Sequence, residues 1–226
     1  VAINWDFLQS SWDKAAKKLI LIGVQDQNVI PEHIIQQWNL DPSIVVLTEV
    51  TSNIRTSNFI NSIDSLITSF TDAEFKMLQP DILISIGGMV VSKRIKKFFR
   101  SYKPAAHWHV DLLRAYDTFG ALTQHVVATP STFFSKMTYG QTASNYQQNI
   151  LNCYNSLREH QAEFVKQAPY SDLKVFEAIF NFIPKNSLLH ISNSSAIRYA
   201  QLIDMPQDLE VFCNRGTSGI DGCTST

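Results

Sequence analysis

Cationic and hydroxyl side chains follow apolar runs at three places in this 226-residue chain. The first place holds Lys93 and Arg94, the second holds Ser194 and Arg198, and the third holds Arg215. Ammonium and guanidinium groups bind carboxylate and phosphate oxygens, and a hydroxyl adds a further hydrogen bond. The types of these residues therefore predict a site for an anionic ligand.

Lys93 and Arg94 come shortly after Gly87-Gly88, where an apolar run ends and a helix is expected to begin. In α/β proteins, ligands bind at such strand ends, and the first amides of a helix attract anions. The positive charge continues at three further positions, Lys96, Lys97 and Arg100. A solvated basic helix is therefore an equally good interpretation, although the Gly-Gly turn favours a carboxylate or phosphate site.

Ser194 and Arg198 are four residues apart, so a helix that begins at Ser195 places them on the same side. Together they could hold a carboxylate through one hydroxyl contact and one forked guanidinium contact. A simple helix cap beside a surface arginine is the competing interpretation, and the local pattern alone favours this cap.

Three of the eight glycines, Gly216, Gly219 and Gly222, are spaced three residues apart near the end of the chain. Such spacing lets backbone amides approach an anionic group closely, and Arg215 adds a fixed charge. A tight turn normally joins two elements, yet the sequence stops four residues after Gly222 and begins with Val1. We therefore expect the chain to be a piece of a longer polypeptide.

His107, His109 and Asp111 alternate along one expected strand, so they share a face and could ligate a divalent metal. Because no fourth ligand is suggested, a structural role at the end of the strand is the favoured interpretation. No GxGxxG and no Walker motif follows the first apolar run, so the sequence does not predict NAD binding or a phosphate-binding loop.

The overall composition excludes several classes of function. Nineteen basic residues against twenty acidic ones give a net charge of −1, which offers no broad attraction to nucleic acid. No apolar run approaches the roughly 20 residues of a membrane span, and we expect no signal peptide. Three widely spaced cysteines favour a reducing compartment, so we expect a cytoplasmic protein.

Short apolar runs alternate with amphipathic segments through the first two-thirds of the chain. The runs cover residues 18–24, 43–50, 81–87, 105–111 and 124–128. The strongest of them are apolar on both faces, which is typical of buried parallel strands. Helices are expected at 5–17, 31–40, 57–70 and, behind a Thr71–Glu74 capping box, before Pro80. The pattern predicts an α/β fold with a doubly wound, mostly parallel sheet.

The pattern changes after Pro130, where two helices are expected in succession, at 144–167 and 171–183. A new strand at 187–192, a helix at 195–203 and a strand at 209–213 then begin a second, truncated α/β unit. We place the boundary near residue 168, which gives a central domain at 1–168 and the start of another domain at 169–226.

Three motifs occur in a fixed order: GGMVVSKR at 87–94, NSSAIR at 193–198 and CNRGTSGIDG at 213–222. With them the chain resembles the 2-succinyl-5-enolpyruvyl-6-hydroxy-3-cyclohexene-1-carboxylate synthases, a family of thiamine-diphosphate-dependent transferases in menaquinone biosynthesis. The resemblance covers the whole chain and is weakest over residues 1–80. It implies a Rossmann-like central domain followed by the opening of a diphosphate-binding domain.

The resemblance also implies roles for individual residues. The family's substrate-binding positions match Lys93, Arg94, Ser194, Arg198 and Arg215, and its cofactor-contacting positions match Gly219 and Ile220. Ile220 corresponds to the bulky residue that supports the bent cofactor beneath its thiazolium ring. Both substrates implied by the family, 2-oxoglutarate and isochorismate, are carboxylates, so cations lower the cost of bringing two anions together.

By this resemblance the reaction decarboxylates 2-oxoglutarate on thiamine diphosphate and adds the succinyl unit to isochorismate, releasing CO2. The family's activating glutamate belongs to an N-terminal domain, and its magnesium motif lies beyond Thr226. We therefore expect no catalytic residue and no metal ligand in this chain, and we predict that the chain alone is inactive and does not bind the cofactor tightly.

The whole enzyme is expected to be a homodimer or homotetramer. Two alternatives stay open. The chain could come from another thiamine-diphosphate enzyme, of the acetohydroxyacid synthase type. It could also be a non-catalytic module that holds a small anion through Lys93 and Arg94.

Overall fold

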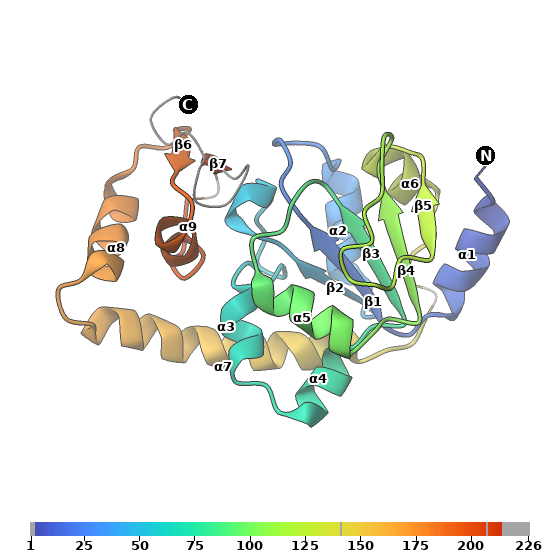
Figure 1. Cartoon of the computed structure of the whole chain (residues 1–226), viewed down its shortest axis with the longest axis horizontal. Helices are drawn as coiled ribbons and strands as arrows, with labels where there is room; N and C mark the ends of the chain where they lie inside the picture. Colours follow the sequence, from blue (N-terminus) through green and yellow to red (C-terminus); the bar gives the residue numbers. More distant parts are fainter. Residues whose placement is uncertain (1–2, 141, 207, 214–226) are drawn as a thin grey trace.

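The computed structural model describes residues 3–140, 142–206 and 208–213, and these residues form two sheets with flanking helices (Figure 1). The larger sheet has five strands in the order β2-β1-β3-β4-β5, and every neighbouring pair is parallel. The strands are β1 (Lys18–Ile22), β2 (Ile44–Leu47), β3 (Ile82–Ile86), β4 (Ala106–Val110) and β5 (Gln124–Val126). The α/β class with a parallel sheet, which the alternating pattern predicts, is confirmed.

Helices cover both faces of this sheet, which is why β1, β2 and β3 are buried along their whole length. On one face lie α1 (Trp5–Lys14), α2 (Glu32–Leu40) and α6 (Pro130–Lys136). On the other face lie α3 (Ile63–Thr68), α4 (Asp72–Leu78), α5 (Lys93–Ser101) and the first half of α7 (Tyr146–Gln167). The two apolar layers hold the strands in place and leave their ends for other roles.

The segment between β2 and α3 differs from the expectation. The helix expected at 57–70 begins only at Ile63, because Ile60 pairs with the edge of β2. Its amide donates to the Val46 carbonyl over 3.0 Å, and its carbonyl accepts from Thr48 over 2.8 Å. The expected strand 43–50 likewise ends at Leu47, and residues 50–52 form the short helix η1 (Val50–Ser52). By contrast, the Thr71–Glu74 capping box of α4 is confirmed.

β1 and β3 approach each other very closely at their carboxyl ends. Gly23 donates to the Ile86 carbonyl over 2.9 Å, and Gly88 donates to the Val24 carbonyl over 2.7 Å. A Cβ atom at Gly23 would lie only 2.1 Å from the carbonyl oxygen of Gly88. The turn after β3, which leads into α5, is therefore fixed against the end of β1.

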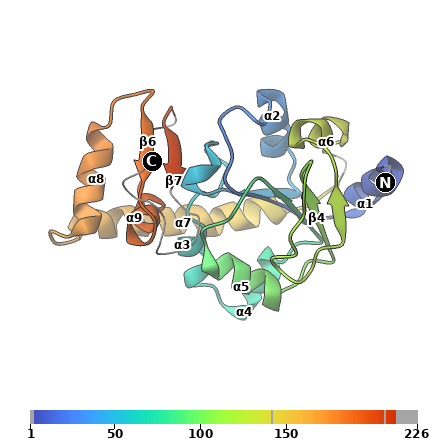
Figure 2. The same ribbon diagram turned by 45° about the horizontal axis from the view of Figure 1, so that its top comes forward.

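The smaller sheet pairs β6 (Leu188–Ile191) with β7 (Glu210–Cys213) in parallel and lies beside α8 (Asp172–Phe182) and α9 (Ser195–Ala200). We call these four elements the second unit. Helix α7 runs from beneath the large sheet to the second unit, as Figures 1 and 2 both show. None of the helices in the described residues, α7 included, is long and apolar enough to cross a membrane. The domain boundary near residue 168 stays a prediction.

Candidate functional site

Lys93 and Arg94 form the first turn of α5, and both side chains are exposed. The helix begins here because the Ser92 hydroxyl accepts a hydrogen bond from the Ile95 amide over 3.0 Å. The buried residues of the helix, Ile95, Phe98 and Phe99, pack against the sheet. The two cations are therefore presented on the side of α5 that faces away from the apolar core.

The amides just before α5 bind a carboxylate of the chain itself. Val91 and Ser92 donate to the two carboxylate oxygens of Glu49 over 2.6 and 2.7 Å, and Glu49 is buried. Glu49 thus occupies two backbone amides just before the helix, whereas the side chains of Lys93 and Arg94 are exposed. The expected contact of these two side chains with an anionic ligand stays a prediction.

These two cations line a groove of about 880 Å³ together with Arg198, which is more than 100 positions away in the sequence. Four helices contribute to its walls: α3, α5, α7 and α9. The remaining lining residues are Ser62, Asp64, Ser65, Thr68, Ser69, Leu157, His160, Gln161, Phe164, Gln201 and Leu202. The fold thus brings together three of the five residues for which substrate contact was expected.

The charge of the groove suits an anionic ligand. Lys93, Arg94 and Arg198 provide three positive charges, against the single carboxylate of Asp64. Asp64 also accepts a hydrogen bond from the Ser92 hydroxyl, which draws part of its charge toward the start of α5. Clustered cations in a concave site raise the local concentration of anions, so the groove is well suited to bind carboxylates.

Hydrogen bonds join the two units around the groove. The Ser62 hydroxyl donates to the Gln201 carbonyl over 2.7 Å, and the Gln161 side chain donates to the Leu202 carbonyl. An ion pair between Arg158 of α7 and Asp204 lies nearby. The walls of the groove are therefore connected to each other even though they come from different units.

Ser194 lies at the start of α9 but does not line the groove. Ser194 occupies the N-cap position of α9, but its side chain makes no capping hydrogen bond. Its backbone has φ = 70°, a conformation that residues with a Cβ seldom adopt. The Ser194 hydroxyl is exposed and stays a predicted ligand contact.

The third group of candidates cannot be placed. Arg215, Gly219 and Ile220 fall within residues 214–226, which lie outside the described residues. Their expected contacts with substrate and cofactor stay predictions.

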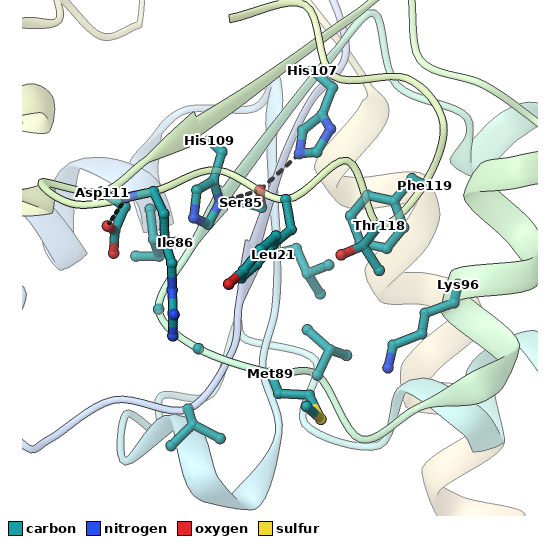
Figure 3. A pocket seen from close by; sticks show the side chains of 16 residues that line it. Leu21, Ser85, Ile86, Met89, Lys96, His107, His109, Asp111, Thr118 and Phe119 are labelled. Carbon is teal, nitrogen blue, oxygen red and sulfur yellow. Dashed lines mark hydrogen bonds between the residues drawn. The ribbon is translucent and has the colours of Figure 1, made fainter. Parts of the chain in front are cut away.

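A second cavity, of about 600 Å³, opens between the sheet and α5 (Figure 3). At its inner wall the Ser85 hydroxyl lies between two imidazoles, 2.7 Å from His107 Nε2 and 2.8 Å from His109 Nδ1. The Asp111 carboxylate accepts from the amides of Leu113 and Arg114 instead of joining the two histidines. Among the described residues, no three His, Cys, Asp or Glu side chains gather to hold a metal ion.

His107 makes the stability of this chain sensitive to acid. Burial and, to a smaller extent, the charge of His109 lower the pKa of His107 to about 4, although Asp117 opposes the shift. Between about pH 6.5 and about pH 4, His107 is protonated in the unfolded chain but stays neutral in the folded chain. Stability should therefore fall as the pH drops through this window, by about 3 kcal/mol at most, and level off below it.

Urea unfolding at pH 7.5, 5.5 and 4.5 measures this effect. His107→Gln, whose amide can still reach Ser85, should show a shallower loss of stability on acidification. The same pH dependence in both proteins would contradict the assignment to His107.

Several residues of these two sites were missed by sequence reasoning. Asp64, His160 and Phe164 line the groove but sit on helices whose local pattern indicates only an amphipathic surface. Ser85 could have been noticed as the one hydroxyl within the apolar run Ile82–Ile86. Glu49 could have been noticed in the same way, as a carboxylate at the end of another apolar run.

Comparison with known proteins agrees with this fold. Residues 9–191 match the family described as "Middle domain of thiamine pyrophosphate", thiamine pyrophosphate being another name for thiamine diphosphate. The match covers most of the chain, so the chain belongs to this family of middle domains from thiamine-pyrophosphate enzymes.

Individual relatives share a more particular name. The chain is 52% identical over 226 residues to the 2-succinyl-5-enolpyruvyl-6-hydroxy-3-cyclohexene-1-carboxylate synthase of Flavobacterium johnsoniae, covering 99% of this chain and 41% of that protein. It is 52% identical over 225 residues to the enzyme of the same name from Flavobacterium psychrophilum, again covering 99% and 41%. The Porphyromonas gingivalis enzyme of this name is 33% identical over 237 residues, covering 98% and 40%. The chain thus spans about two-fifths of the length of the curated relatives it matches.

Proposed function

We propose that this chain provides the middle domain and the opening of the diphosphate-binding domain of a longer 2-succinyl-5-enolpyruvyl-6-hydroxy-3-cyclohexene-1-carboxylate synthase. That enzyme would decarboxylate 2-oxoglutarate on thiamine diphosphate and add the succinyl unit to isochorismate, with release of CO2. The observation that carries the proposal is the groove in which Lys93, Arg94 and Arg198 meet. The shared name of the most similar relatives supports the same reaction.

In this proposal the cations of the groove bind substrate carboxylates. Lys93 and Arg94 approach from the middle domain, and Arg198 approaches from the second unit, so a dianionic substrate can be held from two sides. Ser194 and Arg215 would contribute further contacts. The unusual backbone of Ser194 supports a binding role, because strained residues that persist in a fold are concentrated at functional sites.

Thiamine diphosphate would supply the carbon on which 2-oxoglutarate is decarboxylated. The described residues do not fit the cofactor by themselves, since they gather no acidic cluster for magnesium beside a diphosphate group. We therefore assign Gly219 and Ile220 to the cofactor only as a proposal and leave magnesium to other parts of the enzyme. That the chain alone neither binds the cofactor tightly nor turns over also stays a prediction.

The setting of the enzyme is proposed in the same way. We infer a homodimer or homotetramer with no nucleic-acid partner, working in the cytoplasm. Cys153, which is a free thiol, is compatible with a reducing compartment.

A substrate assay on the complete polypeptide that carries this chain tests the proposal. With thiamine diphosphate and magnesium present, isochorismate and 2-oxoglutarate should be consumed in a one-to-one ratio. Mass spectrometry should detect 2-succinyl-5-enolpyruvyl-6-hydroxy-3-cyclohexene-1-carboxylate and CO2 as the products. A reaction without thiamine diphosphate provides the control. Consumption of pyruvate without any need for isochorismate would favour an acetohydroxyacid synthase type of enzyme. Anion binding without turnover of any of these substrates would favour a non-catalytic module.

A further inference from the structure

We propose that Glu49 and Asn53 are positioning residues for the groove: they fix the helix that carries Lys93 and Arg94 against the unit that carries Arg198. Neither Glu49 nor Asn53 lines the groove. The inference rests on the proposed function, because it concerns how the same groove is held in shape. We call residues 49–55, which contain both side chains, the joint segment.

Glu49 holds the α5 end of the joint segment. Its two carboxylate oxygens accept from the amides of Val91 and Ser92, the residues just before Lys93. Hydrogen bonds from amides to a carboxylate are charge-assisted and are stronger than neutral ones. Since Glu49 is buried, these bonds are shielded from water. The position of the first turn of α5 therefore depends directly on Glu49.

Asn53 holds the other end of the joint segment against the second unit. Its side-chain carbonyl accepts from the Val211 amide over 2.7 Å, and its NH2 group donates to the Val211 carbonyl over 3.1 Å. The same NH2 group donates to the Gln25 carbonyl over 2.9 Å, just after β1. A single side chain thus continues the pairing of β7 and connects it to the large sheet. The left-handed backbone of Asn53, with φ = 51°, is one that asparagine tolerates well.

Arg55 adds a second connection of the same kind. Its guanidinium donates to the Leu209 carbonyl over 2.8 Å and to the Val50 carbonyl over 3.1 Å. One acceptor lies beside β7 and the other lies in η1, so the arginine spans the joint. These hydrogen bonds restrict rotation between the joint segment and the second unit.

Two buried valines from the larger part of the chain complete the apolar core of the second unit. Val50 lies in the joint segment, and Val91 is one of the two residues whose amides donate hydrogen bonds to Glu49. Both pack in one cluster with Phe180, Ile191, Ile197, Ala200, Leu209 and Val211. Ile197 is the neighbour of Arg198. The cluster therefore connects the backbone just before Lys93 with the helix that carries Arg198.

Together these contacts explain how two units can form one binding groove. Cations on separate units must keep a fixed separation to hold a carboxylate, since a displacement of about 1 Å can cost a hundredfold in rate. Loss of the Glu49 or Asn53 contacts should let α5 and α9 move relative to each other, although no residue that lines the groove is substituted. The expected defect is weaker substrate binding, with a smaller change in turnover.

The test uses Glu49→Gln, Asn53→Ala and Asn53→Asp in the complete polypeptide. We expect Glu49→Gln and Asn53→Ala to raise KM for isochorismate or 2-oxoglutarate about tenfold, with kcat changed less. Asn53→Asp keeps the acceptor for the Val211 amide but turns a carboxylate oxygen toward the Gln25 and Val211 carbonyls, so it should raise KM at least as much as Asn53→Ala. Glu49→Gln should also accelerate amide hydrogen exchange at Val211, whose amide donates to Asn53 at the other end of the joint segment.

Thr71→Ala is the matched control, because it removes the capping hydroxyl of α4 and lowers stability away from the joint segment. Its KM values should stay within about twofold of wild type. If Thr71→Ala raises KM as much as Glu49→Gln, the defect is one of general stability and the inference is overturned. Unchanged exchange at Val211 in Glu49→Gln overturns it as well, and this measurement does not require an active enzyme.

Arg198→Ala separates this inference from the proposed function. If Arg198→Ala raises KM but neither Glu49→Gln nor Asn53→Ala does, the groove binds substrate and the positioning role is wrong. If Arg198→Ala has no effect on KM or turnover, the proposed function fails, while hydrogen exchange at Val211 still decides whether the joint segment couples the two units.

Discussion

Replacing Arg198 by alanine is expected to lower kcat/KM of the complete enzyme about a hundredfold. Arg198 is the one described cation that the second unit contributes to the groove, opposite Lys93 and Arg94. Its removal would leave a substrate carboxylate bound from one side only. Steady-state kinetics with isochorismate and 2-oxoglutarate varied separately will show which carboxylate it holds, as the larger rise in KM.

Two further variants make this experiment specific. Arg198→Lys keeps the positive charge but loses the planar fork, so it should recover only part of the activity. Lys14→Ala removes an exposed cation of α1, a helix that does not line the groove, and should have no effect. Activity of Arg198→Ala within about threefold of wild type would be incompatible with a carboxylate-binding role.

Gly23→Ala is expected to destabilise the fold by about 3 kcal/mol, which is at the upper end of the range for overpacking a tight site. The added methyl group would lie 2.1 Å from the Gly88 carbonyl oxygen, so the ends of β1 and β3 would have to separate. The three nearest atoms are all backbone atoms of Gly88, so the backbone itself must move. Urea unfolding followed by tryptophan fluorescence measures the loss.

The same turn offers a matched control for this variant. A Cβ at Gly88 would meet only the Val24 side chain and carbonyl, at 3.4 and 3.5 Å, so Gly88→Ala should cost well under the loss at Gly23. Gly87→Ala should also be costly, because Gly87 has φ = 74° and its Cβ would lie 2.7 Å from the Val24 carbonyl oxygen. Equal stability of Gly23→Ala and Gly88→Ala would show that the turn relaxes easily.

The sequence predicts the large sheet well for a physical reason. Strands buried on both faces, such as β1 and β3, need runs that are almost entirely apolar, and such short runs stand out in the sequence. The joint segment has no such pattern, because its conformation depends on partners distant in the sequence. Asn53 pairs with Val211, a separation of 158 residues, and no local rule contains that information.

The sequence named three residues that line the candidate site, but it did not predict the geometry of that site. The residue types and motifs indicate that Lys93, Arg94 and Arg198 bind anions, and the structure places them in one groove. The local pattern did not predict the positive φ of Ser194 or the absence of a capping hydrogen bond from its side chain. It also did not predict that Glu49 would accept the backbone amides just before α5.

Two valines from the larger part of the chain, Val50 and Val91, pack into the core of the second unit, and this has an evolutionary consequence. Val50 and Val91 are buried among residues that follow Gln167, so the core of the second unit is encoded in three separated stretches. A recombination event that exchanged only the later stretch between relatives would bring together side chains selected in different backgrounds. Chimeras joined after α7 should therefore tolerate exchange best when the donor and the recipient carry the same residues at positions 50 and 91.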